Sequence, residues 1–325
     1  MSPAKTDSWP VTVIRGTPAP EVLADILTLV GAAEEADGNP PFSEQTLVEL
    51  KAKVPGSVLT LLSHAPEEKS SSEGKDLAGV AVVVLNGNDG VLEIAVHPSY
   101  RNEGVGALLV DALVAERGLH GLKAWSHGDH EAAADLAAAY GYRPVRELWR
   151  MRLVRSARPE TPGAAPALPS GVHLRTFVPG QDETAWLAAN AAAFAHHPEQ
   201  GAMTLADLQA RMAEPWFDPA GFFLAVDDAG TILGFHWTKV HPGHGGHADL
   251  GEVYVVGVTP GAQGLGLGKA LTVAGIAHLH GLGLGAIMLY VDADNEAAVA
   301  LYRKLGFTKW DSDVMYGPVA APAKR

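Results

Sequence analysis

The chain contains no cysteine. This absence excludes disulfide bonds, thiolate metal sites and catalysis by a cysteine nucleophile. Basic residues are also scarce, because 24 Lys and Arg stand against 37 Asp and Glu and give a formal net charge of −13. Surfaces that bind nucleic acid are rich in Lys and Arg, so we expect no nucleic-acid partner.

Long hydrophobic runs are absent as well. The longest runs, such as Val80 to Leu85, fall far short of the roughly 20 residues that cross a bilayer. The N-terminal sequence MSPAKTDSWPVTVIRG lacks the apolar centre of a signal peptide. We therefore expect a cytoplasmic protein with no membrane partner, and we expect it to be a monomer.

The stretch from Gly251 to Leu271 carries the most informative pattern in the chain. Its first part, Val253 to Val258, predicts a buried strand, which Pro260 ends because proline cannot donate to a sheet. The sequence Gln-Gly-Leu-Gly-Leu-Gly follows at 263–268 and leads into an apolar helical pattern. A glycine-rich turn between a strand and a helix places backbone N–H groups where they can bind a pyrophosphate.

Three kinds of phosphate loop share this arrangement, and two of them do not fit. A Walker loop needs Ser or Thr after Gly-Lys, whereas Ala270 follows Lys269. A dinucleotide-binding loop has the spacing G-x-G-x-x-G, whereas Gly264, Gly266 and Gly268 alternate. The remaining pattern, Q-x-x-G-x-G after a strand, resembles the acetyl-CoA loop of the GCN5-related N-acetyltransferases. Taken alone, the loop leaves a glycine-rich turn without a ligand as the alternative.

The loop pattern occurs twice in the chain. Residues 96–106 align with residues 258–268 at an offset of 162, and Tyr140-Gly141-Tyr142 later matches Leu305-Gly306-Phe307. Two matches in the same order indicate an internal repeat of domain size. We therefore predict two tandem acetyltransferase domains, at 1–155 and 172–325, joined by a linker at 156–171 that is rich in Pro and Ala.

Each domain is predicted to be a mixed α/β sheet flanked by helices. Strands are expected at 57–63, 77–85, 91–96, 172–177, 222–226, 232–240, 253–258 and 286–291. Helices are expected at 21–33, after an N-cap at Ser43, at 183–194, after an N-cap at Thr204, and at 295–305.

Further motifs in the second half point to one family. They are HPEQG at 197–201, FHWTKVHP at 235–242, and Asn295 followed by a helix that ends in Tyr302-x-x-x-Gly306-Phe307. Together with the loop they resemble the mycothiol synthase family of tandem acetyltransferases. Members of that family use acetyl-CoA to acetylate the cysteine amine of cysteinyl-glucosaminyl-inositol. The resemblance covers nearly the whole chain and implies this activity, with acetyl-CoA as co-substrate, a small-molecule acceptor and no metal.

The resemblance assigns the general base to Glu252 and the general acid to Tyr302. An α-amino group has a pKa of about 8, so a carboxylate that takes its proton turns it into a nucleophile. A phenol can protonate the departing CoA thiolate. From the residues alone, an exposed strand end for Glu252 and a core aromatic residue for Tyr302 remain alternatives.

The resemblance also implies the binding residues. In the second half, the cofactor-binding residues are Val256, Gly257, Val258, Gln263, Gly264, Leu265, Gly266, Leu267, Gly268, Lys269, Asn295, Glu296, Ala297, Ala298, Val299 and Ala300. In the first half, they are Ile94, Ala95, Val96, Asn102, Glu103, Gly104, Val105, Gly106 and Ala107. The acceptor-binding residues are Glu44, Glu199, Lys239, Glu252 and Tyr290. For Glu44, in a first helical turn, a helix-dipole partner is the alternative.

The first half is predicted to lack counterparts of the general base and the general acid. The loop offset of 162 maps Glu252 onto Gly90, and the closing offset of 165 maps Tyr302 onto Ala137. Glu93 lies three residues beyond Gly90, so we expect its side chain on the opposite face of the strand. This half is therefore expected to be non-catalytic, with an intact cofactor loop.

His241, His244 and His247 lie in a loop rich in Gly and Pro rather than on one helical face, so we expect no metal site there.

A tandem acetyltransferase for another small amine or a protein N-terminus is one alternative function, and a non-catalytic acyl-CoA-binding sensor is another. Glu252 and Tyr302 argue against the sensor, because ligand binding alone needs neither residue.

Overall fold

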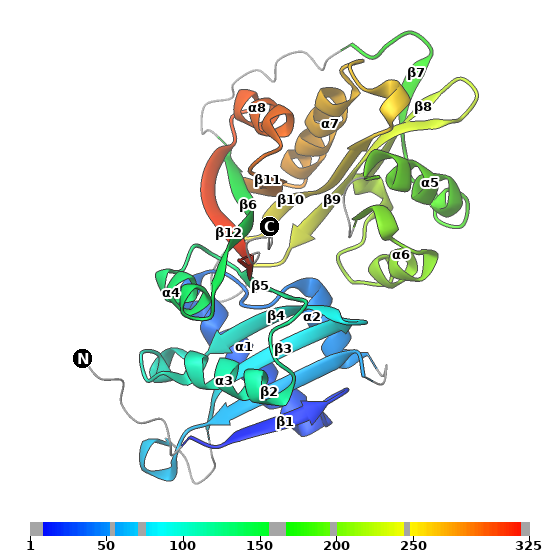
Figure 1. The fold of residues 1–325 in the computed structure, drawn as a ribbon. Coiled ribbons are helices and arrows are strands. Elements are labelled where there is room, and N and C mark those ends of the chain that lie inside the picture. Colours follow the sequence, from blue (N-terminus) through cyan, green and yellow to red (C-terminus); the bar gives the residue numbers. More distant parts are fainter. Residues whose placement is uncertain are drawn as a thin grey trace, which may run out of the picture. The chain divides into compact units, whose positions relative to one another are not determined.

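The computed structural model describes residues 9–52, 56–70, 76–155, 167–195, 200–243 and 248–319. By its contacts the chain divides into two compact units. Unit 1 comprises Met1–Leu148 and Asp311–Arg325, and unit 2 comprises Trp149–Trp310. The end of the chain thus belongs to unit 1, whereas the sequence-based division follows the chain in order. Each unit is a mixed sheet with helices packed on it, which confirms the predicted fold class (Figure 1).

Unit 1 is built on a sheet with the strand order β1-β2-β3-β4-β5-β12. β4 and β5 are parallel, and the other neighbours are antiparallel. The strands are β1 (Val11–Arg15), β2 (Val58–His64), β3 (Leu77–Asn86), β4 (Asp89–Val96), β5 (Leu122–Ser126) and the later part of β12 (Thr308–Pro318). The helices are α1 (Pro20–Asp37), α2 (Glu44–Lys51), α3 (Val105–Glu116) and α4 (Glu131–Ala139).

Unit 2 repeats this plan with the strand order β11-β10-β9-β8-β7. β10 and β11 are parallel, and the other neighbours are antiparallel. The strands are β7 (Val172–Thr176), β8 (Phe222–Asp227), β9 (Ile232–His241), β10 (Leu250–Val258) and β11 (Ala286–Asp292). The helices are α5 (Glu183–Ala193), α6 (Leu205–Met212), α7 (Leu267–Gly281) and α8 (Glu296–Lys304). β6 (Tyr142–Val154) begins in unit 1 and ends in unit 2.

Polar side chains set the starts of several helices. Ser43 accepts a hydrogen bond from the backbone N–H of Thr46, and Thr204 forms a reciprocal capping box with Asp207. Both N-caps were predicted and are confirmed, because a side-chain oxygen satisfies an N–H group that the helix itself leaves without a partner. Asn295 caps α8 in the same way.

Helices cover both faces of each sheet in an equivalent arrangement. In unit 1, α1 and α2 pack on the face that carries Ala95, and α3 packs on the face that carries Leu92. In unit 2, α5 and α6 pack on the face that carries Val255, and α7 and α8 pack on the face that carries Val253. Within the described ranges, no helix has the length and apolar character needed to cross a bilayer.

In each unit the parallel pair of strands separates before the first strand ends. β10 pairs with β11 over Gly251–Val253 and then continues to Val258. β4 pairs with β5 over Gly90–Glu93 and continues to Val96. Beyond the last pair, that edge of the first strand can accept an extended ligand that adds to the sheet like a strand. The carbonyl oxygens of Val96 and Val258 on this edge accept hydrogen bonds from the side chains of Arg101 and Gln263.

Candidate active site

The glycine-rich loop of unit 2 joins the end of β10 to the start of α7. Gly264 and Gly266 adopt φ values of 80° and 79°, a backbone conformation that favours glycine. Gly266 is the N-cap of the 15-residue helix α7 and has no side chain to bond its first N–H groups, which remain for a ligand. A Cβ added at either glycine would meet nothing within 4 Å, so an anion can approach the backbone closely.

The edge of β10 beyond its last pair with β11 leads directly to this loop. Val256, Gly257 and Val258 pair with β9 on one side and lie beyond the last pair with β11 on the other. An extended chain with amide groups, such as pantetheine, suits this edge because its amides can pair with the backbone. The predicted cofactor-binding segments at 256–258 and 263–269 are therefore continuous in space.

Three predicted acceptor-binding residues share one face of the unit 2 sheet. Glu252 pairs with Lys239 of β9 and with Met288 of β11. Its neighbour Val253 faces α7 and α8, so Glu252 faces the side of α5 and α6. Tyr290 lies two residues beyond Met288 and therefore shares that face. Only 5% of Glu252 is exposed, which excludes an exposed strand end.

Aromatic rings adjoin the ammonium group of Lys239. Its Nζ lies 4.6 Å from the ring centroid of Trp216 and 5.2 Å from that of Tyr254. Nε of Arg211 donates a hydrogen bond of 3.1 Å to the hydroxyl of Tyr254. Sequence analysis missed Trp216 and Arg211, because both belong to the α6 region, which is distant from β10 along the chain.

Sequence analysis also missed a hydrogen bond to the predicted base. Nε2 of His241 lies 2.6 Å from Oε2 of Glu252. His241 ends β9 two residues after Lys239, so alternation places both on the face of Glu252. The described residues contain no group of three side chains that could hold a metal ion, and His244 and His247 lie outside them.

Tyr302 lies on the other side of the unit 2 sheet from Glu252. It belongs to α8 and packs in the same apolar cluster as Val253, with 8% of its surface exposed. Burial raises the pKa of its phenol to about 12, so the hydroxyl keeps its proton at neutral pH. Unit 2 thus holds a buried carboxylate on one face of its sheet and a protonated phenol on the other.

The first loop keeps the backbone of the second. Asn102 and Gly104, in the positions of Gly264 and Gly266, have φ values of 63° and 82°. A cavity of about 450 Å³ adjoins this loop, and the predicted cofactor residues of the first half line it, apart from Glu103, which pairs with Lys69.

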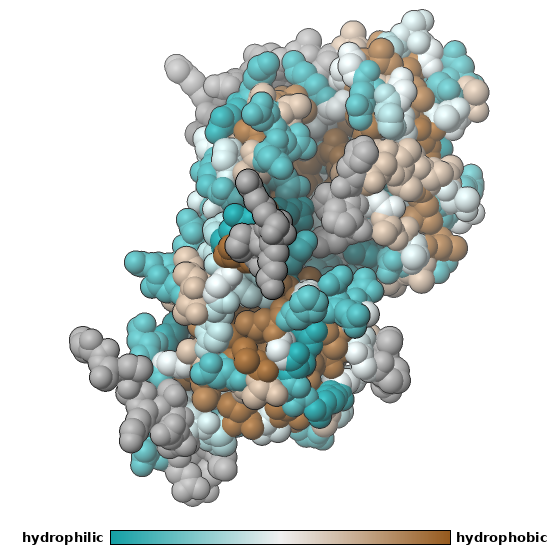
Figure 2. Space-filling model, in the orientation of Figure 1, coloured by the Kyte–Doolittle hydropathy of each residue, from teal (hydrophilic) through white to brown (hydrophobic). Residues whose placement is uncertain are grey.

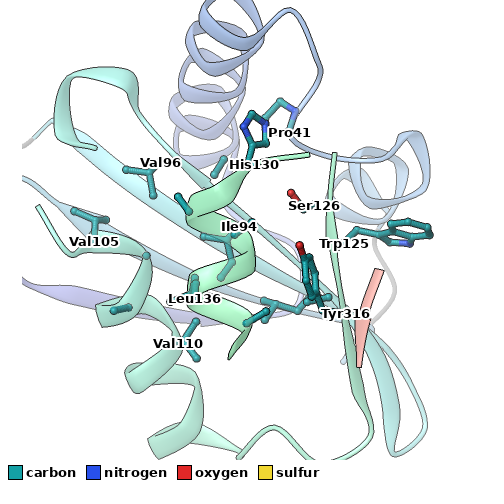
Figure 3. A pocket seen from close by; sticks show the side chains of 18 of the residues that line it. Pro41, Ile94, Val96, Val105, Val110, Trp125, Ser126, His130, Leu136 and Tyr316 are labelled. Carbon is teal, nitrogen blue, oxygen red and sulfur yellow. The ribbon is translucent and has the colours of Figure 1, made fainter. Parts of the chain in front are cut away.

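Hydrophobic side chains form much of the wall of this cavity. Figure 3 shows Ile94 and Val96 of β4, Val105 and Val110 of α3 and Leu136 of α4 around the same space. On the face drawn in Figure 2, hydrophobic side chains gather on unit 1 over the region of α3 and β4. Ala137, the predicted counterpart of Tyr302, also lines the cavity, so no phenol is present at that position.

A β-bulge in β10 changes which residues of β10 and β4 correspond to each other. The pairing of β10 with β9 skips Tyr254, whereas β4 pairs with β3 without a shift. Glu252 therefore corresponds to Val91, and its predicted match with Gly90 is wrong. Glu93 lies two residues from Val91 and hence on the same face, not on the opposite face as predicted.

Glu93 belongs to a buried cluster of charged groups in unit 1. Nε2 of His127 lies 2.8 Å from Oε1 of Glu93, and Nδ1 lies 3.0 Å from Oδ2 of Asp313. The backbone N–H of Ser43 donates to Glu93 as well, at 3.1 Å. Burial lowers the pKa of His127, but the hydrogen bonds to Asp313 and Glu93 raise it by more, to about 9. Both ring nitrogens are engaged, so the cluster ties β12 to β4 and offers no proton-accepting nitrogen.

The other two predicted acceptor-binding residues come from different parts of the chain. Glu44 is exposed in the first turn of α2, in unit 1, where it also interacts favourably with the helix dipole. Glu199 lies outside the described residues.

Comparisons with known proteins define the class. Residues 186–307 match the sequence model of the Acetyltransferase (GNAT) family, and residues 68–144 match that of an Acetyltransferase (GNAT) domain. A tandem GNAT protein from the clavulanic acid biosynthesis pathway shares the fold, with a TM-score of 0.69 at 18% identity over 97% of this chain and 100% of that one. A GCN5-related N-acetyltransferase from Sphaerobacter thermophilus gives a TM-score of 0.65 at 27% identity over 95% of this chain and 98% of that one. The chain consists of two tandem GNAT domains.

Proteins named mycothiol acetyltransferase are more similar in sequence. The one from Arthrobacter sp. is 66% identical over 98% of this chain and 99% of its own length. The one from Renibacterium salmoninarum is 54% identical over 95% of this chain and 90% of its own length. The chain belongs to the mycothiol acetyltransferase family.

Proposed function

We propose that the chain transfers the acetyl group of acetyl-CoA to the cysteine amine of cysteinyl-glucosaminyl-inositol, the last step of mycothiol biosynthesis. Its similarity to proteins named mycothiol acetyltransferase over nearly the full chain supports this function. The observation that carries it is the position of Glu252, a buried carboxylate on the strand that precedes the glycine-rich loop.

Unit 2 binds the acetyl donor in this proposal. The loop at 263–268 and the first turn of α7 hold the pyrophosphate through backbone N–H groups, and Lys269 adds positive charge. The edge of β10 at 256–258 pairs with the pantetheine arm and directs the thioester toward the point where β10 and β11 separate. The first turn of α8, at 295–300, lies beside the same arm.

Glu252 and Tyr302 then divide the proton transfers between them. Glu252 takes a proton from the acceptor ammonium, directly or through a water molecule, and the amine nitrogen attacks the thioester carbonyl. A C–N bond forms and the C–S bond breaks. Tyr302 gives its proton to the departing sulfur. Lys239 and Tyr290 bind polar groups of the acceptor on the face of Glu252.

Unit 1 is the non-catalytic half in this proposal. Val91 stands in the position of Glu252, and Ala137 in that of Tyr302, so neither a base nor an acid is present there. The cavity beside its loop suits a second CoA molecule, because the loop has the same backbone as in unit 2.

The test is the mass of the product formed from acetyl-CoA and the cysteinyl sugar beside a panel of other amines. We expect acetylation of the cysteine amine. Glu252→Gln and Tyr302→Phe should each lower kcat by roughly 100-fold or more while acetyl-CoA still binds. Acetylation of other amines but not of the cysteinyl sugar would reject the acceptor. Normal turnover in both variants would reject the catalytic roles.

A further inference from the structure

Glu252 shares its face of the sheet with a histidine that contacts it. Nε2 of His241 lies 2.6 Å from Oε2 of Glu252. An ionised carboxylate can only accept, so His241 donates through its Nε2–H. The side chain of Glu252 is 7% exposed and that of His241 is 35% exposed, so the hydrogen bond is formed in a mostly buried setting. It engages Oε2 of Glu252.

The two units permit an internal comparison at this position. In unit 2, Leu250 pairs with His241, and in unit 1 the equivalent pair is Asp89 with Asn86. The same registers place Val84 and Val91 of unit 1 at the positions of Lys239 and Glu252. Unit 1 thus forms the same strands with none of the three polar side chains. The fold therefore does not require a histidine at the end of β9, and His241 occurs together with Glu252 and Lys239.

We propose that His241 is a positioning residue for Glu252 in acetyl transfer. This inference rests on the proposed role of Glu252 as the general base. The donated hydrogen bond holds the carboxylate in one orientation, with Oε1 directed to the acceptor amine. A base contributes fully only when it stands within hydrogen-bond reach of the proton it removes. Without His241 the Glu252 side chain can rotate away from that position.

Variants of His241 test the hydrogen bond directly. His241→Ala removes the donor, and His241→Gln supplies an amide N–H that can donate to the same oxygen. We expect His241→Ala to lower kcat by about tenfold with the KM for acetyl-CoA unchanged, and His241→Gln to recover most of the loss. Equal impairment of the two variants would overturn the proposal. Should His241→Ala fail to fold, His241→Asn replaces it, because unit 1 carries Asn86 at this position and the shorter amide cannot reach Glu252.

A double-variant cycle separates positioning from other roles. In the Glu252→Gln background, removal of His241 should cost little further activity, because no base remains to be positioned. A full additional loss in that background would overturn the proposal. His173→Ala, at an exposed site on β7, is the control and should retain wild-type kinetics. Wild-type turnover in the single variant Glu252→Gln would instead reject the proposed base, whatever the effect of His241.

Discussion

Asn102 and Gly264 hold the same left-handed position in the two glycine-rich loops, with φ values of 63° and 80°. Asn102 is the one non-glycine residue with positive φ in the part of the chain that the structure describes. Asparagine tolerates this conformation better than most residues, so the loop forms without glycine there. The following glycines, Gly104 and Gly266, are the N-caps of α3 and α7. Unit 1 therefore keeps the loop backbone of unit 2, although it lacks counterparts of the proposed base and acid.

Blocking the two loops should have unequal effects on catalysis. Gly106 and Gly268 lie in the first turns of α3 and α7, and a Cβ at either makes ordinary contacts, with Leu136 at 3.5 Å and with Val258 at 3.8 Å. We expect Gly268→Trp to abolish acetyl transfer, because the indole fills the proposed pyrophosphate-binding loop of unit 2. Gly106→Trp should leave most of the turnover and remove CoA binding to unit 1, measured by calorimetry. Loss of turnover in a folded Gly106→Trp protein would show that the chemistry depends on unit 1.

Counting residues along the chain aligned the two glycine-rich loops correctly but failed before the β-bulge in β10. The loop offset is correct at Val258 and Val96, because these residues adjoin the loops. Before the bulge at Tyr254 the offset changes by one residue, so Glu252 corresponds to Val91. A shift of one residue moves every side chain to the other face of a strand. No local sequence pattern in β10 reveals where the extra residue is inserted.

Contacts between segments that are distant along the chain could not be predicted from the sequence patterns either. The α6 region places Trp216 beside Lys239, and β12 brings Asp313 to His127. Local periodicity predicts where helices and strands form, but it carries no information about which segments meet. Side-chain caps such as Ser43 were predictable because the donor and acceptor lie within three residues of each other.

His127 gives unit 1 a pH-dependent contribution to stability. Its pKa is about 9 in the folded chain and about 6.5 when unfolded. Because folding raises this pKa, the stabilisation is complete below pH 6.5 and is lost as the pH rises through 9. The difference between the two pKa values corresponds to a stabilisation of about 3 kcal/mol at most.

Urea unfolding of wild type and His127→Gln near pH 6 and near pH 9.5 checks this prediction. The gap in free energy of unfolding between the two proteins should be large at the lower pH and small at the higher one. His120→Gln, at an exposed site in the same unit, is the control and should behave as the wild type at both values. A gap that does not change with pH would contradict the assigned charge of His127.

His236 sets how closely α7 approaches the sheet of unit 2. Its Nδ1–H donates to the carbonyl oxygen of Leu271 at 2.8 Å, and burial lowers its pKa to about 4, so the ring is neutral. The ring lies where a Cβ on Gly275 would be placed. We expect Gly275→Ala to destabilise the protein by roughly 1–3 kcal/mol, because the overpacked ring must shift. Gly281→Ala, in the same helix with nothing within 4 Å, should be neutral or slightly stabilising in chemical denaturation. Equal effects of the two changes on the free energy of unfolding would mean that helix propensity, rather than packing against His236, determines the effect of Gly275→Ala.

Two lysines of unit 2 should affect the binding of different substrates. Lys239 lies on the face of Glu252, with its ammonium 4.6 Å from the Trp216 ring, whereas Lys269 lies in the first turn of α7 after the loop. We expect Lys239→Ala to raise the KM for the acceptor by about tenfold and to leave that for acetyl-CoA unchanged. Lys269→Ala should raise the KM for acetyl-CoA instead. This rise in KM should be smaller at high salt, because salt screens the attraction between exposed charges. Initial rates with each substrate varied in turn measure both effects. If Lys239→Ala weakened acetyl-CoA and spared the acceptor, the acceptor would have to bind away from the face that carries Glu252.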